Sequence, residues 1–259
     1  MEPSIRPVFA TQATPLQQQL SSLFASSEAM PSEPEVLAVV VPDSNLASGG
    51  KTAANVYQSL DKSVYDTVVI ISSAGVESKK EISICSLDEY VSPLGAVSID
   101  DTLRNELCDE DDDIFLDDSG HFQGRGVDVQ LPFLQSKLES FTIIPIVMGV
   151  ESPEYCEELG HAIGEIMFNR SVLVVVCSEL LEAGESELTT FRTCFESLDV
   201  DGLATLMNRE DGLRVRGKGP LLVAMIATRY RRAEEVHVLT MDLPQDGNPG
   251  YIGALISRK

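Results

Sequence analysis

The sequence predicts a single-domain α/β protein whose central sheet is largely parallel or mixed and carries helices on both faces. Two observations lead to this fold class. Several short runs are apolar throughout and rich in β-branched residues, as expected of strands that are covered on both faces. Helical periodicity follows three of these runs, and a repeated strand-then-helix order is typical of a parallel sheet between two helical layers. At 259 residues the chain can bury one substantial core.

The expected elements follow one another in a regular order. Residues 1–35 are predicted to be an N-terminal arm with one short helix at about 15–26, and residues 36–259 to be the α/β domain. The predicted central strands are 36–41, 66–72, 141–149 and 171–177, and the helices after the first, third and fourth are 50–60, 152–168 and 187–207. A peripheral pair of strands, a helix and two last strands complete the prediction: 82–87 with 95–99, 220–232, 236–242 and 251–257.

The charge of the chain is strongly negative. It has 41 acidic and 19 basic residues, a formal net charge of −22. A nucleic-acid-binding surface needs positive charge to displace counterions from phosphates, so we do not expect nucleic acid as a ligand. An anionic membrane surface would repel the chain for the same reason. An acidic surface favours a basic protein or peptide partner, whose identity the charge does not reveal.

The cysteines and the hydropathy indicate a cytoplasmic protein. The five cysteines, at positions 85, 108, 156, 177 and 194, form no C-x-x-C pair, and an odd, scattered set is typical of a reducing compartment. The first residues, MEPSIRPVFATQ, contain no apolar core of a signal peptide. The longest apolar stretches, such as residues 143–150, are too short to span a bilayer.

One glycine-rich turn resembles a nucleotide-binding loop. Residues 45–52 read NLASGGKT after an apolar strand, and a phosphate-binding loop has the pattern G-x-x-x-x-G-K-[ST]. Asn45 stands where the first glycine belongs, and no carboxylate follows a later strand in the setting expected for Mg²⁺. The alternative to nucleotide binding is a plain strand-to-helix turn with Lys51 in solvent.

Polar residues follow the predicted strands at the positions where open α/β sheets bind their ligands. The segments concerned are Pro42-Asp43-Ser44, Ser72-Ser73-Ala74-Gly75 and Cys177-Ser178-Glu179.

An ordered series of motifs runs through almost the whole chain. The motifs are VPDSNLASGG, VVIISSAG, SPLGAVSID, DSGHFQGRGVDVQLPFLQ, VVVCSELLE, VRGKGP and PGYIGA. In this order they resemble the motifs of the Memo family, which shares its fold with the class III extradiol dioxygenases. The most specific single piece is VQLPFLQ at 129–135. The resemblance therefore implies an extradiol dioxygenase-like fold.

The departures from the family pattern fall on polar positions at the strand ends. The family carries two histidines and a cysteine that resemble a mononuclear metal site, and here these positions are Asp43, Gly75 and Arg216. Three further family residues, His, Asp and His, are replaced by Arg125, Glu179 and Glu182. Of the histidines in these motifs His121 remains, and Asp128 replaces the family glutamate.

These replacements point away from the family chemistry. A redox iron or copper site needs imidazole or thiolate ligands and an open position, whereas glycine supplies no ligand and arginine repels a cation. We therefore expect a pseudoenzyme without a metal or other cofactor, which binds a protein or ligand or serves in an assembly. Its pocket is expected to be formed by Asp43, Ser44, Ser73, Gly75, His121, Arg125, Asp128, Cys177, Glu179, Glu182 and Arg216.

Two alternatives stay open at this stage. The arginines could pair with the carboxylates, or Asp43, His121, Glu179 and Glu182 could hold Mg²⁺, Mn²⁺ or Ca²⁺ in a metal-dependent enzyme, either a dioxygenase-like oxidoreductase or a hydrolase. Cys177 could be a reactive thiol, although no histidine nearby in sequence would activate it, or a buried inert cysteine.

Overall fold

The computed structural model describes residues 12–28, 35–62, 64–74, 80–110, 113–209 and 212–259. Gly75, one of the expected pocket positions, lies outside these residues, as does most of the N-terminal arm before the first helix. None of the helices in these ranges has both the length and the hydrophobicity that a membrane span requires.

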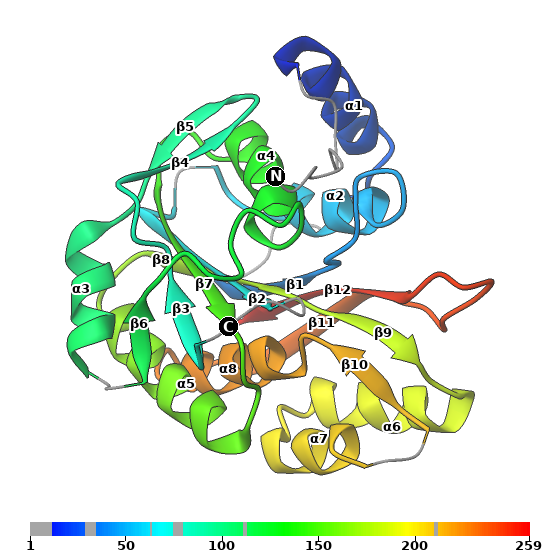
Figure 1. Ribbon diagram of the computed structural model, residues 1–259. Coiled ribbons are helices and arrows are strands. Elements are labelled where there is room, and N and C mark those ends of the chain that lie inside the picture. The colour runs from blue at the N-terminus through cyan, green and yellow to red at the C-terminus, as the bar shows by residue number, and fades with distance from the viewer. Residues whose placement is uncertain (1–11, 29–34, 63, 75–79, 111–112, 210–211) are drawn as a thin grey trace, which may run out of the picture.

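A ten-stranded mixed sheet forms the centre of the molecule (Figure 1). Its strand order is β10-β9-β12-β1-β8-β2-β7-β3-β6, and β11 pairs with the other side of β12. The parallel middle consists of β1 (Val36–Val41), β8 (Val172–Cys177), β2 (Thr67–Ser73) and β7 (Thr142–Met148). The outer strands are β3 (Ile82–Ile84), β6 (Ile114–Leu116), β9 (Glu179–Glu182), β10 (Arg214–Arg216), β11 (Glu235–Met241) and β12 (Gly250–Ser257).

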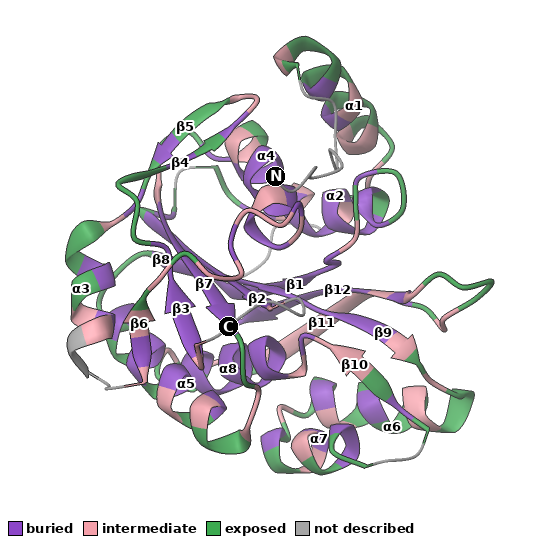
Figure 2. Ribbon diagram, in the orientation of Figure 1, coloured by how far each residue is buried: buried purple, intermediate pink, exposed green. Residues whose placement is uncertain are grey.

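Helices cover both faces of this sheet (Figure 1). One face is covered by α1 (Ala13–Ala25), α2 (Gly50–Gln58) and α4 (Val127–Lys137), together with a small hairpin of β4 (Glu89–Ser92) and β5 (Gly95–Ser98). The other face is covered by α3 (Asp101–Glu110), α5 (Pro153–Met167), α6 (Glu185–Glu196), α7 (Val200–Met207) and α8 (Lys218–Arg229). Each face has its own apolar core, because every residue of β1 and β8 is buried. Figure 2 shows the buried strands between helices whose exposed positions face outward.

Most of the predicted framework is confirmed. The chain forms a single α/β domain. The four central strands and the two last strands lie within a few residues of their predicted bounds, and so do the helices after β1, after β7 and before β11. The sheet is mixed, because β12 and β3 run antiparallel to their neighbours β1 and β7.

Two predictions are wrong. Residues 82–87 and 95–99 do not pair with each other, because β3 joins the main sheet between β7 and β6, and β5 pairs with β4 across a turn at Pro93. The helix predicted at 187–207 is two helices, α6 and α7. The break lies at Leu198, which has a φ of 55°, and Asp199 starts α7 by accepting a hydrogen bond from the Gly202 amide at 3.0 Å.

Candidate functional site

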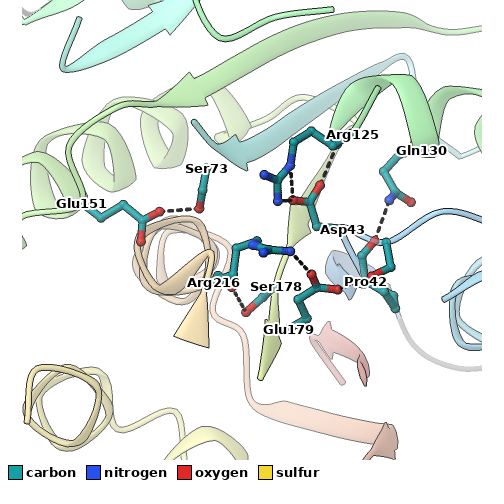
Figure 3. A network of polar contacts seen from close by, with 11 residues as sticks. Pro42, Asp43, Ser73, Arg125, Gln130, Glu151, Ser178, Glu179 and Arg216 are labelled. Atoms are coloured by element: carbon teal, nitrogen blue, oxygen red, sulfur yellow. Dashed lines mark hydrogen bonds and ion pairs between the residues drawn. The ribbon is translucent and has the colours of Figure 1, made fainter. Parts of the chain in front are cut away.

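The carboxyl ends of the central strands bring the candidate residues together (Figure 3). Val41 of β1 is paired with Cys177 of β8. Asp43 and Glu179, each two residues further along, therefore leave the sheet at the same edge, which is the ligand-binding edge of open α/β folds.

Asp43 is the centre of the first ion pair. It is 4% exposed, and Arg125 donates to its Oδ2 from Nε at 2.8 Å and also from Nη2. Its other oxygen accepts a hydrogen bond from the Gly126 amide at 2.7 Å. Gly126 has a φ of 56°, and an added Cβ would overlap Ser72, so the turn before α4 can approach Asp43 only with glycine at this position. Both oxygens of the carboxylate therefore have donors within the protein.

Glu179 is the centre of the second ion pair. Its side chain is 0% exposed, and its oxygens accept from the Ser44 hydroxyl at 2.7 Å and from Nη1 of Arg216. Burial raises the pKa of Glu179, and the Ser44 hydrogen bond and the Arg216 charge oppose this shift only in part. The two arginines thus approach from the turn before α4 and from β10 to neutralise two carboxylates that the sheet brings side by side.

Buried polar and thiol groups lie beneath these ion pairs. Gln130 of α4 is fully buried; it donates to the Pro42 carbonyl at 2.8 Å and accepts from the Tyr57 hydroxyl at 3.0 Å. Cys177 is 1% exposed, and burial, with a smaller contribution from the Asp43 charge, raises the pKa of its thiol well above the ordinary range. A thiol held in this protonated state is a poor nucleophile.

A tight turn positions Arg216. Gly217 has a φ of 74°, and a Cβ there would overlap the Cys177 carbonyl oxygen. The Ser178 hydroxyl donates to the Arg216 carbonyl at 3.2 Å. The turn leads directly into α8, where Glu151 accepts from the Gly219 amide at 2.9 Å and from the Ser73 hydroxyl. Ser73 is thereby held at the rim of the site by Glu151, beside the ion pairs (Figure 3).

The remaining candidate residues lie apart from the two ion pairs. Asp128 is a neighbour: it accepts from the Tyr90 hydroxyl and the Gly124 amide, both at 2.7 Å, and burial is the main reason that its pKa is raised. His121 is 7% exposed and its Nε2 lies 3.3 Å from the Ser83 carbonyl oxygen of β3, further along the sheet. Glu182 is 60% exposed and pairs at 2.5 Å with Arg214 on the surface.

A hollow of ≈ 330 Å³ opens beside Ser44, Glu179 and Arg216. Its other wall is the loop between β11 and β12, with Leu181 at the side; the loop residues are 244–249. Sequence reasoning missed this loop, which carries no strand-end signal, and it also missed Glu151 and Gln130. Glu151 follows β7 at its carboxyl end, so the rule for ligand positions in open sheets could have found it.

The donor set does not fit the family metal. The oxygens of Asp43 and Glu179 already accept hydrogen bonds, and two guanidinium groups with permanent positive charge adjoin them. Within the residues that can be described, no three His, Cys, Asp or Glu side chains are grouped as metal ligands.

The turn at residues 45–52 does not have the geometry of a nucleotide-binding loop. The Asn45 side chain accepts from the amides of Ala47 and Ser48 at 3.0 and 3.1 Å, and its carbonyl accepts from the Gly49 amide at 2.9 Å. These amides are the groups that would have to point at a phosphate. Because they are satisfied inside the turn, the loop has the geometry of a strand-to-helix connection, and Lys51 is exposed on α2.

The chain is similar to known proteins over most of its length. The family described as Memo-like protein matches residues 8–248. A MEMO1 family protein of Saccharolobus islandicus is 29% identical over 230 residues, which cover 83% of this chain and 81% of that protein. One from Sulfurisphaera tokodaii is 28% identical over 228 residues, covering 82% and 80%. An uncharacterized protein from Escherichia coli K12 has a similar fold, with a TM-score of 0.54 at 11% identity, over 86% of this chain and 100% of that one. With its family matched over nearly all of its residues, the chain belongs to the Memo family.

Proposed function

We propose that this chain is a Memo-family protein without metal chemistry, a pseudoenzyme that acts as a binding or assembly component. The observation that carries the proposal is the pair of buried carboxylates neutralised by arginines at the ligand-binding edge, Asp43 with Arg125 and Glu179 with Arg216. A guanidinium stays charged at every physiological pH, so it opposes a cation under all conditions in which the protein works.

The hollow beside Arg216 is the place where we expect a partner to bind. The Arg216 side chain is 36% exposed and Nη1 donates to Glu179, and a guanidinium has five N–H donors, so Arg216 can donate to a ligand as well. Exposed polar residues of the 244–249 loop form the opposite wall. A wall of hydrogen-bonding groups around a small hollow suits a peptide segment of a partner protein, held by its backbone and one acidic group.

Metal analysis of the purified protein tests the first part of this proposal. After purification without chelators and incubation with Fe²⁺, Cu²⁺ or Zn²⁺, we expect far less than one metal ion per chain. We also expect no rise in melting temperature with Mg²⁺, Mn²⁺ or Ca²⁺, because a ligand that does not bind the folded state cannot stabilise it. Stoichiometric metal that is lost in an Asp43→Ala or a Glu179→Ala variant would instead support a rebuilt, carboxylate-rich metal site and an enzyme.

Site-specific photo-crosslinking tests the second part. A photoreactive benzoylphenylalanine at Asn248, in the wall of the hollow, is expected to give a discrete adduct in cells, and Arg216→Glu is expected to abolish it. The matched control carries the same group at Phe168, which is 60% exposed and follows α5, at the opposite ends of the strands. The same adducts from both positions, or an adduct that Arg216→Glu leaves unchanged, would overturn the assignment of the hollow.

A further inference from the structure

A second hollow lies on the face of the sheet that α1, α2 and α4 cover. Its volume is ≈ 530 Å³, a size suited to a small organic molecule. Its lining residues come from α1, from the end of α2 and the segment that follows it, and from the end of α4: Gln17, Leu20, Ser21, Phe24, Gln58, Lys62, Ser136 and Lys137. None of these residues belongs to the site described above.

The charge of this lining is opposite to that of the protein. Acidic residues outnumber basic ones by 41 to 19 in the chain, yet the lining residues that the structure describes include two lysines and no carboxylate. The other polar members are two glutamines and two serines, whose side chains carry hydrogen-bond donors; of these, the Ser136 hydroxyl donates to the Pro132 carbonyl at 2.8 Å. A hollow with two ammonium groups and neutral donors is suited to an anion.

The two lysines lie close enough to affect each other. Lys137 is half-buried, and its Nζ donates to the Gln58 carbonyl at 2.9 Å, where it satisfies an acceptor at the end of α2. Burial is the main cause that lowers the pKa of Lys137, and the positive charge of Lys62 adds to it, while Asp61 has a smaller opposing effect. An anion between the two ammonium groups would relieve this repulsion, and two N–H groups of Lys137 remain to bind it.

The apolar wall of the hollow is fixed in position. Leu20 is 1% exposed, and the Phe24 ring packs edge-on against Phe133 of α4 at a centroid distance of 5.9 Å. Phe133 in turn stacks on Tyr57 of α2 at 5.4 Å. Helix α1 is therefore anchored to α4, which is itself anchored to α2, and the hollow is preformed.

From this arrangement we infer that the hollow between α1, α2 and α4 binds a small organic anion. Lys62 and Lys137 would bind its charged head, and the half-buried Phe24 would contact an apolar or aromatic body. The head can be a carboxylate or a phosphate, since both accept charge-assisted hydrogen bonds from ammonium groups. This inference is independent of the proposed function, because the two sites share no residue.

Calorimetric titration at about 0.15 M salt, where long-range repulsion by the acidic surface is screened, tests the inference with three related probes. Benzoate carries a carboxylate head, phenyl phosphate a phosphate head, and benzyl alcohol no charge. We expect saturable binding of at least one anion. The anion that binds more tightly, benzoate or phenyl phosphate, identifies the head group as a carboxylate or a phosphate. Benzyl alcohol is expected to bind at least about tenfold more weakly, which is the loss of roughly one charge-assisted hydrogen bond.

Two pairs of variants place the binding in the hollow. Lys62→Gln removes an exposed lining charge and is expected to weaken anion binding about tenfold, whereas Lys51→Gln makes the same change at the other end of α2 and is expected to have no effect. Ser21→Glu puts a carboxylate into the lining and is expected to abolish binding, whereas Ser22→Glu, the next residue of the same helix, is not.

Three results would overturn the inference. The first is the absence of saturable binding up to about 10 mM of either anion, a concentration above the Kd of almost any specific complex. The second is an affinity for benzyl alcohol equal to that for the anions. The third is an equal loss of anion affinity in the Lys62→Gln and Lys51→Gln variants. The last result would move the binding to the turn before α2.

Discussion

Arg125 donates from Nε to Oδ2 of Asp43 over 2.8 Å, across 82 positions of the sequence. The carboxylate is almost fully buried, and the arginine side chain is 26% exposed. Removing one member of a buried ion pair lowers the free energy of unfolding by more than the intact pair contributes to it, because the remaining charge stays buried away from water. Substitution of one partner and measurement of protein stability can therefore test the Asp43–Arg125 pair.

Arg125→Met should reduce the free energy of unfolding by about 3 kcal/mol, because it removes the guanidinium hydrogen bonds to the buried Asp43 carboxylate and leaves the bond from the Gly126 amide. The matched control is Arg214→Met, which removes an arginine from the exposed pair with Glu182 and should change stability by less than about 1 kcal/mol. Urea denaturation followed by circular dichroism measures both. Equal effects in the two variants would contradict the burial of the Asp43 pair.

Gly217→Ala should destabilise the fold by about 3 kcal/mol, from left-handed strain together with overlap of the new Cβ with the Cys177 carbonyl oxygen. Gly247→Ala is the matched control. Gly247 has a φ of 78°, yet nothing lies within 4 Å of an added Cβ, so only the strain of about 1 kcal/mol remains. Thermal denaturation distinguishes the two, and similar losses would argue against the close approach of the turn that carries Arg216.

His121 should make the protein less stable in mild acid. Burial lowers the pKa of His121 in the folded state, whereas an unfolded histidine binds a proton near its ordinary pKa of about 6.5. The unfolded chain therefore gains a proton that the folded chain resists as the pH falls through this value, and stability declines below it. The difference in melting temperature between wild type and His121→Gln should shrink from pH 7.5 to pH 5.5. A constant difference over this range would contradict a neutral, buried imidazole.

Two thiols should react rapidly in the native protein. Cys108 and Cys194 are half-buried, whereas burial raises the pKa of Cys85 to about 11 and that of Cys156 to about 12, and shifts the pKa of Cys177 in the same direction. Titration with a chromogenic disulfide at pH 8 should therefore detect two thiols quickly, and all five after unfolding. Cys108→Ser with Cys194→Ser should remove the rapid phase. A rapid third thiol that disappears in Cys177→Ser would show that Cys177 is reactive.

The central strands could be predicted because a strand that is buried on both faces has an unbroken run of apolar residues, such as VLAVVV in β1. Shorter elements carry no such signal. Strand β4 alternates exposed and buried residues over only four positions. Helix α4 contains Pro132 and follows Gly126, which has a positive φ, and neither feature is expected of a helix from the sequence. The break at Leu198 depends on a local backbone conformation that no periodicity encodes.

The site divides in the same way. The strand-end rule and the family motifs locate Asp43 and Glu179, because the carboxyl ends of neighbouring strands must meet. The partner of each carboxylate is decided by tertiary packing, which brings Arg125 from the turn before α4 and Arg216 from β10. The same packing leaves Glu182 on the surface and His121 beside β3, although both stand in motifs of the site.

Restoring the family residues should restore a metal site. A variant with Asp43→His, Gly75→His, Arg125→His and Arg216→Cys returns imidazole and thiolate ligands to the positions of the family pattern and removes both guanidinium charges. We expect this variant to bind about one Zn²⁺ or Fe²⁺ per chain, because such ligands suit these ions, and wild type to bind none. Metal content and the absorption spectrum of the Co²⁺ form measure this. The control changes the same four positions to Asn, Asn, Asn and Ser, which supply neither imidazole nor thiolate. If the control binds as much metal, or the restored variant is folded by circular dichroism and binds none, these four replacements do not decide whether the chain binds the family metal.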